Sequence, residues 1–383
     1  MEGPKLGGKL RQSRIALVVG TRPEAIKLSP VAKALADLGE PPRLFVTGQH
    51  PGLELAQHGM AGFAATPLCC PGQPDPLLHA DLVRAALRRV LALSAPDLLV
   101  VQGDTSSALG GALAARDAGI RLAHVEAGLR SHDLRQPWPE EENRVAIDRL
   151  SDLLFAPTEC NAINLAKEQA RGEIFVTGNT GIDALAVFAG PLPARHRLRW
   201  LPRGKFRLLV TCHRRENWEG GLDHLAAALI SLGEQGVISD VVLPPNPTVT
   251  ATICRLMGKR PTIRLLAPMS HPAIIQAMRK ADLVLSDSGG MQEEAPALGV
   301  PLLVLREKTE RPEGVACGSM ELVGTDPSRI VATINRLRRE PAALRRMSQP
   351  AMPFGDGHAA PRIAARCLEF IGAPAATRQT APA

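Results

Sequence analysis

The fold class is decided by the stretch DLLVVQGDTSSALGGALAARDAGIRLAHVEAG, residues 97–128. A strand-like apolar run (97–103) precedes a helical pattern (105–118) and a second strand-like run (121–128). Both runs are rich in Val, Leu and Ala, as is typical of parallel strands buried on both faces. Thr105 stands where a helix N-cap is expected. The stretch therefore predicts a strand–helix–strand unit of a parallel sheet.

The same alternation continues in both directions along the chain. Strands are expected at 14–20, 43–48, 152–158 and 173–178, with helices at 24–38, 77–93, 139–150, 159–169 and 180–188. A Pro- and Arg-rich segment (191–205), interpreted as a linker, precedes a second such series that begins at FRLLVTC. We predict two doubly wound α/β domains at 14–190 and 206–355, a final helix at 356–372, and disordered ends at 1–13 and 373–383. Ligands bind such sheets at the carboxyl ends of the strands, so a cleft between the domains is the expected site.

Composition excludes several classes of protein. The 383 residues are 45% hydrophobic and 22% charged, and no apolar run reaches the roughly 18 residues of a membrane span. The net charge is +7, but the chain has no Tyr, and its 8 Phe and 3 Trp do not interleave with basic runs, so nucleic-acid binding is not expected. The seven Cys form no CxxC pair, which argues against a disulfide framework or a zinc site and favours a reducing cytoplasm.

Polar residues gather directly after the predicted strands. GTRPEAIK (20–27) offers a helix N-terminus and Arg22 to a phosphate, although Arg22 could equally cap a neighbouring helix. Backbone N–H groups of a Ser-Gly-Gly run (288–290) can cradle a diphosphate, and Glu294 can accept from ribose hydroxyls. No GxGxxG is present, so dinucleotide binding is not supported.

Acids follow two strands of the first predicted domain. Asp104 and Glu126 lie in loops that have few structural reasons to carry a carboxylate, whereas Glu141 and Glu142 fit the first turn of a helix. His213 follows the first strand of the second domain, beside two Arg. The combination suits proton transfer on a nucleotide-diphospho substrate, because acids in a dry cleft can be tuned to different pKa values.

Ten motifs occur in an order that resembles the bacterial non-hydrolysing UDP-N-acetylglucosamine 2-epimerases, from about residue 15 to 370: GTRPEAIK, TGQH, GDT, HVEAGLR, PWPEE-NR, VTGNT-IDAL, HRREN, DSGG-QEEAP, TERPEG and FGDG. The resemblance implies a GT-B fold of two Rossmann-like domains whose C-terminal helix crosses back to the first. It also implies that the C2 proton is removed, UDP is expelled to leave a 2-acetamidoglucal, and UDP adds back to give UDP-N-acetylmannosamine, a precursor of cell-surface polysaccharide. No metal or cofactor is implied, and the family is commonly a cytoplasmic homodimer.

Site residues follow from the motifs, position by position. The resemblance implies catalytic roles for Asp104, Glu126, Glu140 and His213, the last of these close to the leaving diphosphate. It implies UDP binding by Arg22, Arg215, Ser288, Gly289, Gly290, Glu294 and Arg311. Gln49 and His50 fall on a loop that helps to bind an activating UDP-sugar in the family, and form a candidate regulatory site.

Three departures from the family pattern bear on substrate fit. The turn LPPNP (243–247) lacks a His that usually lines the cleft, and PGLEL follows TGQH in place of the usual polar residues. Ile274 stands where an aromatic is expected near the uracil, with His271 at a neighbouring position that is often Tyr.

Four alternatives to this reading stay open. A hydrolysing epimerase would release free N-acetylmannosamine and UDP. An epimerase on a UDP-diacetamido-glucuronic acid would tend to carry GARPQ in place of GTRPE. A GT-B glycosyltransferase would need an acceptor groove, which no feature of the sequence demands. A catalytically silent sensor would have no need of the four catalytic residues.

Overall fold

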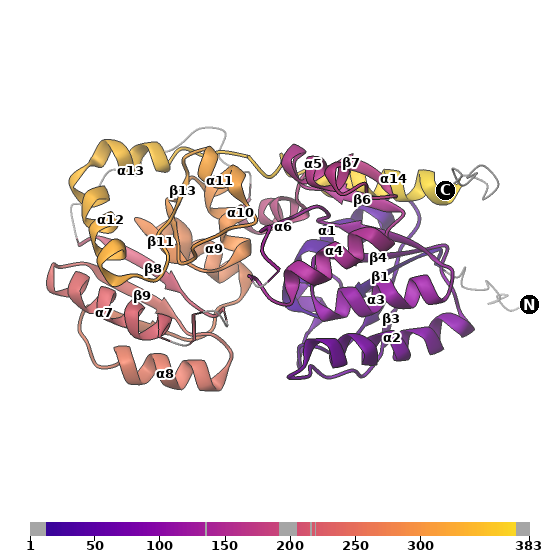
Figure 1. Ribbon diagram of the computed structural model, residues 1–383, viewed down its shortest axis with the longest axis horizontal. Helices are drawn as coiled ribbons and strands as arrows, with labels where there is room; N and C mark the ends of the chain where they lie inside the picture. Colours follow the sequence, from indigo (N-terminus) through magenta and orange to yellow (C-terminus); the bar gives the residue numbers. More distant parts are fainter. Residues whose placement is uncertain (1–12, 135, 191–204, 215–216, 219, 373–383) are drawn as a thin grey trace, which may run out of the picture. The chain divides into compact units, whose positions relative to one another are not determined.

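The computed structural model describes residues 13–134, 136–190, 205–214, 217–218 and 220–372 (Figure 1). The chain forms two compact units. The first contains the residues up to Gly128, Glu142–Thr180 and those from Ala360 onward, and the second contains Leu129–Glu141 and Gly181–Ala359. The predicted domain boundaries differ from this division, because they place 129–141 and 181–190 in the first domain. The ends predicted to be disordered lie outside the described residues except for Ser13.

The first unit is built on a seven-stranded sheet in the order β3-β2-β1-β4-β5-β6-β7, and every pairing is parallel. Its elements are β1 (Ile15–Val19), α1 (Arg22–Asp37), β2 (Arg43–Val46), the 3₁₀ helix η1 (Leu55–His58), β3 (Ala65–Pro67), α2 (Pro76–Leu93), β4 (Leu98–Gln102), α3 (Ser106–Asp117), β5 (Arg121–Val125), α4 (Glu140–Leu150), β6 (Leu153–Ala156), α5 (Glu159–Lys167), β7 (Glu173–Val176) and α14 (Ala359–Gly372). The strand order reverses between β1 and β4, the point at which doubly wound sheets bind ligands.

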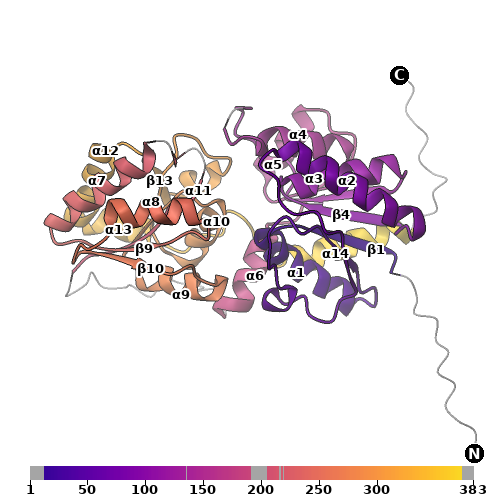
Figure 2. The ribbon, with the colours of Figure 1, turned by 90° about the horizontal axis from the view of Figure 1, so that it is seen from below.

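Helices cover both faces of this sheet, as alternate residues along β1 show. Ile15, Leu17 and Val19 pack with α1 and α14, whereas Ala16 and Val18 pack with α2 and α3. Figure 2 shows α1 and α14 on one side of the strands and α2 and α3 on the other. The last helix therefore completes the core of the unit in which the chain begins.

The second unit repeats the plan with a six-stranded parallel sheet in the order β10-β9-β8-β11-β12-β13. Its elements are α6 (Thr180–Ala189), β8 (Arg207–Thr211), α7 (Gly221–Glu234), β9 (Ile238–Val242), α8 (Pro247–Met257), β10 (Ile263–Leu266), α9 (His271–Lys280), β11 (Leu283–Ser286), α10 (Gly289–Leu298), β12 (Leu302–Val304), α11 (Pro312–Ala316), β13 (Met320–Leu322), α12 (Pro327–Arg339) and α13 (Pro341–Met347). Here the order reverses between β8 and β11.

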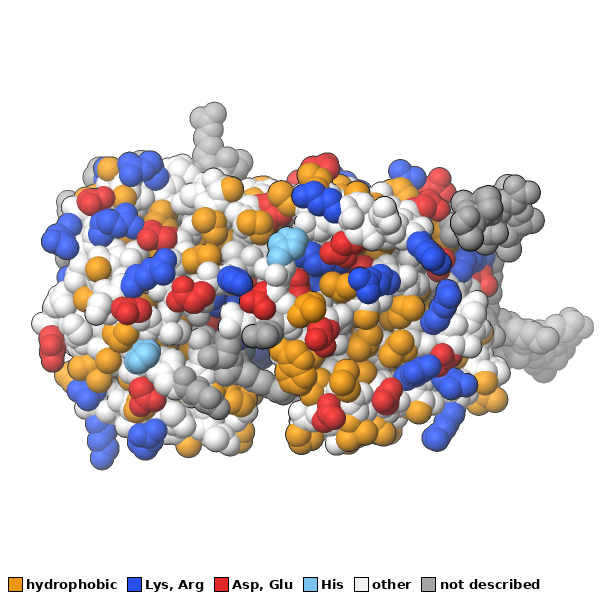
Figure 3. Space-filling view, viewed as in Figure 1, with side chains coloured by type: hydrophobic (Ala, Val, Ile, Leu, Met, Phe, Trp, Pro, Cys, Tyr) orange, Lys and Arg blue, Asp and Glu red, His pale blue; other side chains and the backbone are white. Residues whose placement is uncertain are grey.

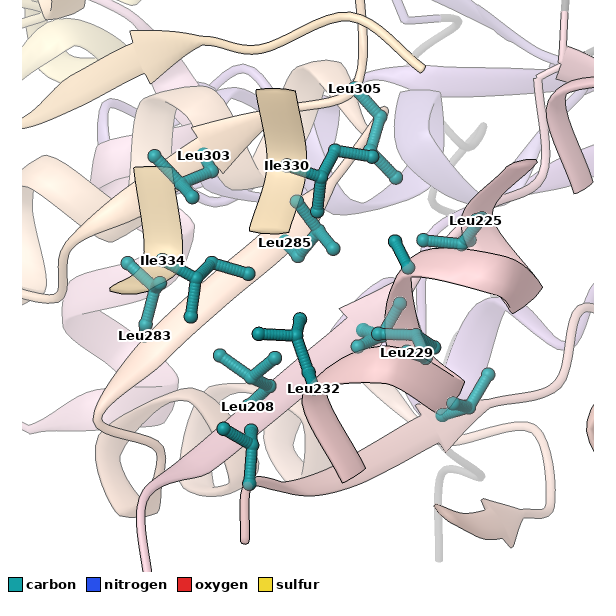
Figure 4. Packing of buried hydrophobic residues seen from close by; sticks show 14 of the residues in the cluster. Leu208, Leu225, Leu229, Leu232, Leu283, Leu285, Leu303, Leu305, Ile330 and Ile334 are labelled. Carbon is teal, nitrogen blue, oxygen red and sulfur yellow. The ribbon is translucent and has the colours of Figure 1, made fainter. Parts of the chain in front are cut away.

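One face of the second sheet carries an aliphatic core with α7 and α12, in which Leu208, Leu285 and Leu303 meet Leu229 and Ile330 (Figure 4). The opposite face packs against α6, α9 and α10. Each helix turns one apolar stripe toward the sheet. Helices on both faces therefore bury the sheet, as expected for α/β layers.

Three short elements were absent from the sequence prediction, namely β3, η1 and β13. Each has three or four residues. A stretch of this length carries too few residues to show a period of either 2 or 3.6. Edge strands such as β3 and β13 form only because a neighbouring strand offers its hydrogen-bonding edge.

Charges of both signs are interspersed over the surface that Figure 3 shows, with no single basic patch. Among the described residues, no helix combines the length and apolar character needed to cross a bilayer.

Candidate active site

Asp104 follows β4 at the reversal point of the first sheet, directly before the N-cap Thr105 of α3. Its carboxylate forms an ion pair with Arg144 of α4, whose side chain is 3% exposed. Its backbone oxygen accepts from Asn143 Nδ2 at 2.9 Å. Helix α4 therefore fixes both the main chain and the side chain of this acid.

Glu126 follows β5, the strand beside β4, and is buried with a left-handed backbone (φ 73°). Its carboxylate accepts from Lys27 Nζ at 2.5 Å, from Gln102 Nε2, and from Asn179 Nδ2 at 3.3 Å. These partners come from α1, from the end of β4 and from the segment before α6. Because all three are donors, the carboxylate is held in place as an acceptor, which suits a general base.

Glu140 opens α4 and lies 3.6 Å from Arg214 Nη1, within the second unit. Its neighbour Glu141 is buried and accepts from the backbone N–H groups of Ser131 and His132 at 2.9 and 3.1 Å. Glu141 thus fixes the preceding loop, which is a structural role, although a different one from the helix-dipole role expected from the sequence.

His213 follows β8 at the reversal point of the second sheet, and its side chain is 48% exposed. Its Nδ1 lies 3.1 Å from Asp287 Oδ1, and among the described residues its Nε2 has no partner. The geometry leaves one ring nitrogen bound to a carboxylate and the other open to a ligand.

Asp287 is fully buried at the end of β11. Burial by itself would raise its pKa, but hydrogen bonds from His213, the backbone of Arg214 and the Asn217 amide more than offset it, so the pKa lies below its usual range. The backbone N–H groups of His213 and Arg214 donate to Oδ2 at 2.9 and 2.8 Å. One ionised carboxylate therefore organises the described start of the HRREN loop. Arg215 itself lies outside the described residues.

The Ser-Gly-Gly run forms the start of α10, with Ser288 as N-cap and Gly289 and Gly290 in the first turn. The Ser288 side chain makes no capping bond to the helix. Farther along α10, Glu294 Oε1 pairs with His271 Nε2 at 2.6 Å, and Phe188 packs edge-on against the His271 ring. The imidazole of His271 thus contacts Glu294, the residue predicted to bind the ribose.

Arg311 is buried and forms ion pairs with Glu293 and Glu310 at 2.6 and 2.5 Å. Its guanidinium also lies against Gly289, since a Cβ built on that glycine would be 3.1 Å from Nη1. The structure thus shows Arg311 supporting the start of α10. Its contact with substrate stays a prediction.

Arg22 begins α1 beside a closed capping box. Glu24 Oε2 accepts from the N–H groups of Gly20 and Thr21 at 2.7 and 2.6 Å, and burial raises the pKa of Glu24. Because Glu24 occupies these donors, the predicted phosphate contact at this end would rest on the side chain of Arg22, which is an exposed residue.

Of the two candidate regulatory residues, Gln49 belongs to a polar network around Ser107. Ser107 Oγ donates to Gln49 Oε1 at 2.7 Å. The Nε2 atom of the buried His79 lies 3.2 Å from Ser107 Oγ. His50 Nδ1 accepts from the Arg22 backbone at 3.3 Å, which connects this loop to the start of α1.

Sequence reasoning missed the partners of the predicted catalytic groups: Lys27, Gln102, Arg144 and Asn179 around the acids, and Asp287 beside His213. Lys27, Arg144, Asn179 and Asp287 stand inside the quoted motifs, and Gln102 ends an otherwise apolar strand. A polar residue that ends an apolar run was the available signal for Gln102. No local signal indicates which residue meets which acid, because Arg144 pairs with Asp104 across 40 positions.

Comparisons with known proteins agree with one another. A sequence model of the family described as UDP-N-acetylglucosamine 2-epimerase matches residues 35–368. The UDP-N-acetylglucosamine 2-epimerase of Escherichia coli strain K12 is 38% identical over 367 residues, covering 91% of this chain and 97% of the relative.

Solved structures show the same likeness. The UDP-GlcNAc 2-epimerase of Neisseria meningitidis, bound to UDP-GlcNAc, is 34% identical with a TM-score of 0.86, over 93% of this chain and 99% of that one. The enzyme of Methanocaldococcus jannaschii, in complex with UDP-GlcNAc and UDP, is 30% identical with a TM-score of 0.78, over 93% and 99%. The predicted fold class, a GT-B fold of two Rossmann-like domains, is confirmed.

Proposed function

Because this chain belongs to the UDP-N-acetylglucosamine 2-epimerase family, we propose that it interconverts UDP-N-acetylglucosamine and UDP-N-acetylmannosamine. The family match over most of the chain is the observation that carries the choice of substrate. We also propose that the protein is a cytoplasmic homodimer and that it supplies precursors for cell-surface polysaccharide.

The proposed reaction is an elimination followed by an addition. A carboxylate takes the proton from C2 of the sugar, the C2–H electron pair forms the C1–C2 double bond, and the bond from C1 to the UDP oxygen breaks. UDP then attacks C1 of the 2-acetamidoglucal while a proton returns to C2 on the opposite face. Atoms and charge balance without a further reactant.

Glu126 and Asp104 are proposed as the groups that exchange the C2 proton. The three donors around Glu126 hold its carboxylate in one orientation, and Arg144 does the same for Asp104. A general base in such a position contributes about 10²–10⁴-fold to a rate. Glu140, which lies beside Arg214, is proposed to assist the same proton transfers.

The diphosphate is proposed to meet the second unit at His213 and at the start of α10. The open Nε2 of His213 can donate to the departing phosphate oxygen, and the N–H groups of Ser288, Gly289 and Gly290 suit an anion. Arg22, Arg215 and Arg311 are proposed to add positive charge, and Glu294 to accept from the ribose. Gln49 and His50 are proposed as part of a regulatory site for a second UDP-sugar.

The first test follows UDP-N-acetylglucosamine in D₂O by NMR. We expect deuterium at C2 together with UDP-N-acetylmannosamine. Free N-acetylmannosamine with UDP would identify a hydrolysing enzyme. No exchange at all would contradict the proposed substrate and direct the assay to UDP-diacetamido uronic acids.

Variants of the acids test the assignment of roles. Glu126→Gln and Asp104→Asn should each lower kcat by about 10²–10⁴-fold, because the proton acceptor is lost. Glu142→Gln is the matched control, an exposed acid in the first turn of α4, and should keep normal turnover. Near-normal kcat in Glu126→Gln would show that another group takes the proton.

A further inference from the structure

His124 is a fully buried histidine in β5 that the proposed reaction does not use. Its Nδ1 lies 2.6 Å from Asp148 Oδ1, and its Nε2 lies 2.8 Å from the backbone oxygen of Gly103. Asp148 comes from α4, and its side chain is 2% exposed. Both ring nitrogens thus face an oxygen in a place that water does not reach.

The partners fix the number of protons that the pair carries. The oxygen of Gly103 can only accept, so Nε2 carries a proton. A second proton must lie between Nδ1 and Oδ1, because two lone pairs at 2.6 Å would repel. His124 and Asp148 therefore share one proton in a hydrogen bond between buried groups, which is the form in which buried polar groups are tolerated.

The pair connects the two turns that carry the candidate acids. Through His124 it holds the Gly103 oxygen, one residue before Asp104, in a turn where Gly103 has φ 68°. Through Asp148 Oδ2 it accepts from the Gly128 N–H at 3.2 Å, two residues after Glu126.

Helix α4 contributes to the same arrangement from three positions on its inner side. Asn143 and Arg144 hold Asp104, and Asp148, one turn beyond Arg144, holds His124. The helix, the strand β5 and both turns are thereby linked by hydrogen bonds between buried or partly buried groups.

We propose that His124 and Asp148 are positioning residues of the epimerase reaction, which hold Asp104 and Glu126 in the geometry that proton transfer at C2 requires. Neither residue touches the substrate. The inference rests on the proposed function, since it assigns the two acids their task. A displacement of about 1 Å in a catalytic group can cost about 100-fold in rate.

Two variants remove the hydrogen bonds and one retains them. His124→Phe and Asp148→Ala should lower kcat and the rate of C2 exchange by about 100-fold, with KM and the Kd of UDP within about threefold. Asp148→Asn can donate to Nδ1 of His124 and still accept from the Gly128 N–H, so it can keep both of these hydrogen bonds. It should keep kcat within about tenfold of the wild type.

Leu154→Ala is the control for general loss of stability. Leu154 is a fully buried residue of β6, the register partner of His124, and contributes to a separate small core. It should lower Tm while kcat stays within about threefold at a temperature where the protein is folded.

The outcomes separate positioning from a merely structural role. A kcat for His124→Phe or Asp148→Ala no lower than that of Leu154→Ala would overturn the proposal. So would an Asp148→Asn variant as slow as Asp148→Ala. If His124→Phe does not fold, the difference in kcat between Asp148→Ala and Asp148→Asn decides whether the proposal holds.

A second readout does not depend on activity. In ¹⁵N-histidine NMR of the wild type, Nε2 of His124 should carry the proton that it donates to Gly103, and Asp148→Ala should shift the Nδ1 resonance, because Nδ1 loses its hydrogen bond. A wild-type ring without a proton on Nε2, or an Nδ1 resonance unchanged in Asp148→Ala, would refute the pair. A wild type that shows this NMR result but does not turn over UDP-N-acetylglucosamine would refute the proposed function. The hydrogen-bonded pair of His124 and Asp148 would still be supported.

Discussion

At the scale of single residues, the second unit depends on one buried carboxylate. The pKa of Asp287 lies below its usual range, so its ionised form stabilises the fold. This contribution is complete above the ordinary pKa of about 4 and is lost as the pH falls through the folded-state value. The wild type should therefore lose stability on acidification more steeply than Asp287→Asn, by at most about 1.4 kcal/mol per pH unit for one proton. Urea unfolding between pH 5 and pH 2.5 measures the difference.

The surface residue Asp117 provides the contrast for that measurement. A hydrogen bond from Arg84 lowers the pKa of Asp117 in an exposed pair. Salt screens exposed charges far more than buried ones. The pH effect of Asp117→Asn should fade in 1 M salt, whereas that of Asp287→Asn should persist. Equal loss of both effects in salt would contradict a buried role for Asp287.

At the scale of elements, the first turn of α10 contains one glycine that packs against another side chain and one that does not. A Cβ at Gly289 would meet Arg311 at 3.1 Å, but a Cβ at Gly290 would have only Ser288 Oγ nearby, at 4.0 Å. Gly290→Ala should therefore leave the free energy of unfolding unchanged or raise it by up to about 1 kcal/mol. It should weaken UDP binding at least about tenfold, because the methyl group would stand where the diphosphate is proposed to approach the N–H groups.

Isothermal titration with UDP and urea unfolding check the two halves of this prediction. Gly372→Ala is the control, because it too lies in a helix with open space around its Cβ. That variant should not change the Kd of UDP. Unchanged UDP affinity in Gly290→Ala would remove the start of α10 from the proposed binding site.

At the scale of the whole molecule, the chain returns to complete the core in which it began. The apolar side of α14 contributes Ile363, Cys367 and Phe370 to the core around β1, and burial raises the pKa of the Cys367 thiol to about 12. A chain that ends at His358 lacks α14 and should expose the face of the sheet that this helix covers. Its first unit should therefore unfold at a lower temperature than that of the full chain. Cys367 should resist thiol reagents in the folded chain, since a protonated, buried thiol is unreactive.

A chain that ends at Gly372 serves as the control and should unfold at the same urea concentration as the full chain. Labelling of Cys367 reports on the docking of α14 in the full chain. Rapid labelling under native conditions would contradict the packing described for this helix.

The sequence by itself determined the alternation of strands and helices, the two sheets and the positions of the candidate acids. Those features are local, because a buried parallel strand is a continuous apolar run and a polar residue that closes it is visible in the chain. Asp104, Glu126 and His213 were identified in this way.

Only the tertiary structure decided how those residues are held. Arg144 reaches Asp104 across 40 positions, and His124 meets Asp148 across 24. The segment Leu129–Glu141 groups with the second unit although it is continuous in sequence with the first. Such pairings depend on which strands become neighbours in the sheet and which helix covers their ends. Propensity and periodicity act within a few residues and carry no information about contacts between distant segments.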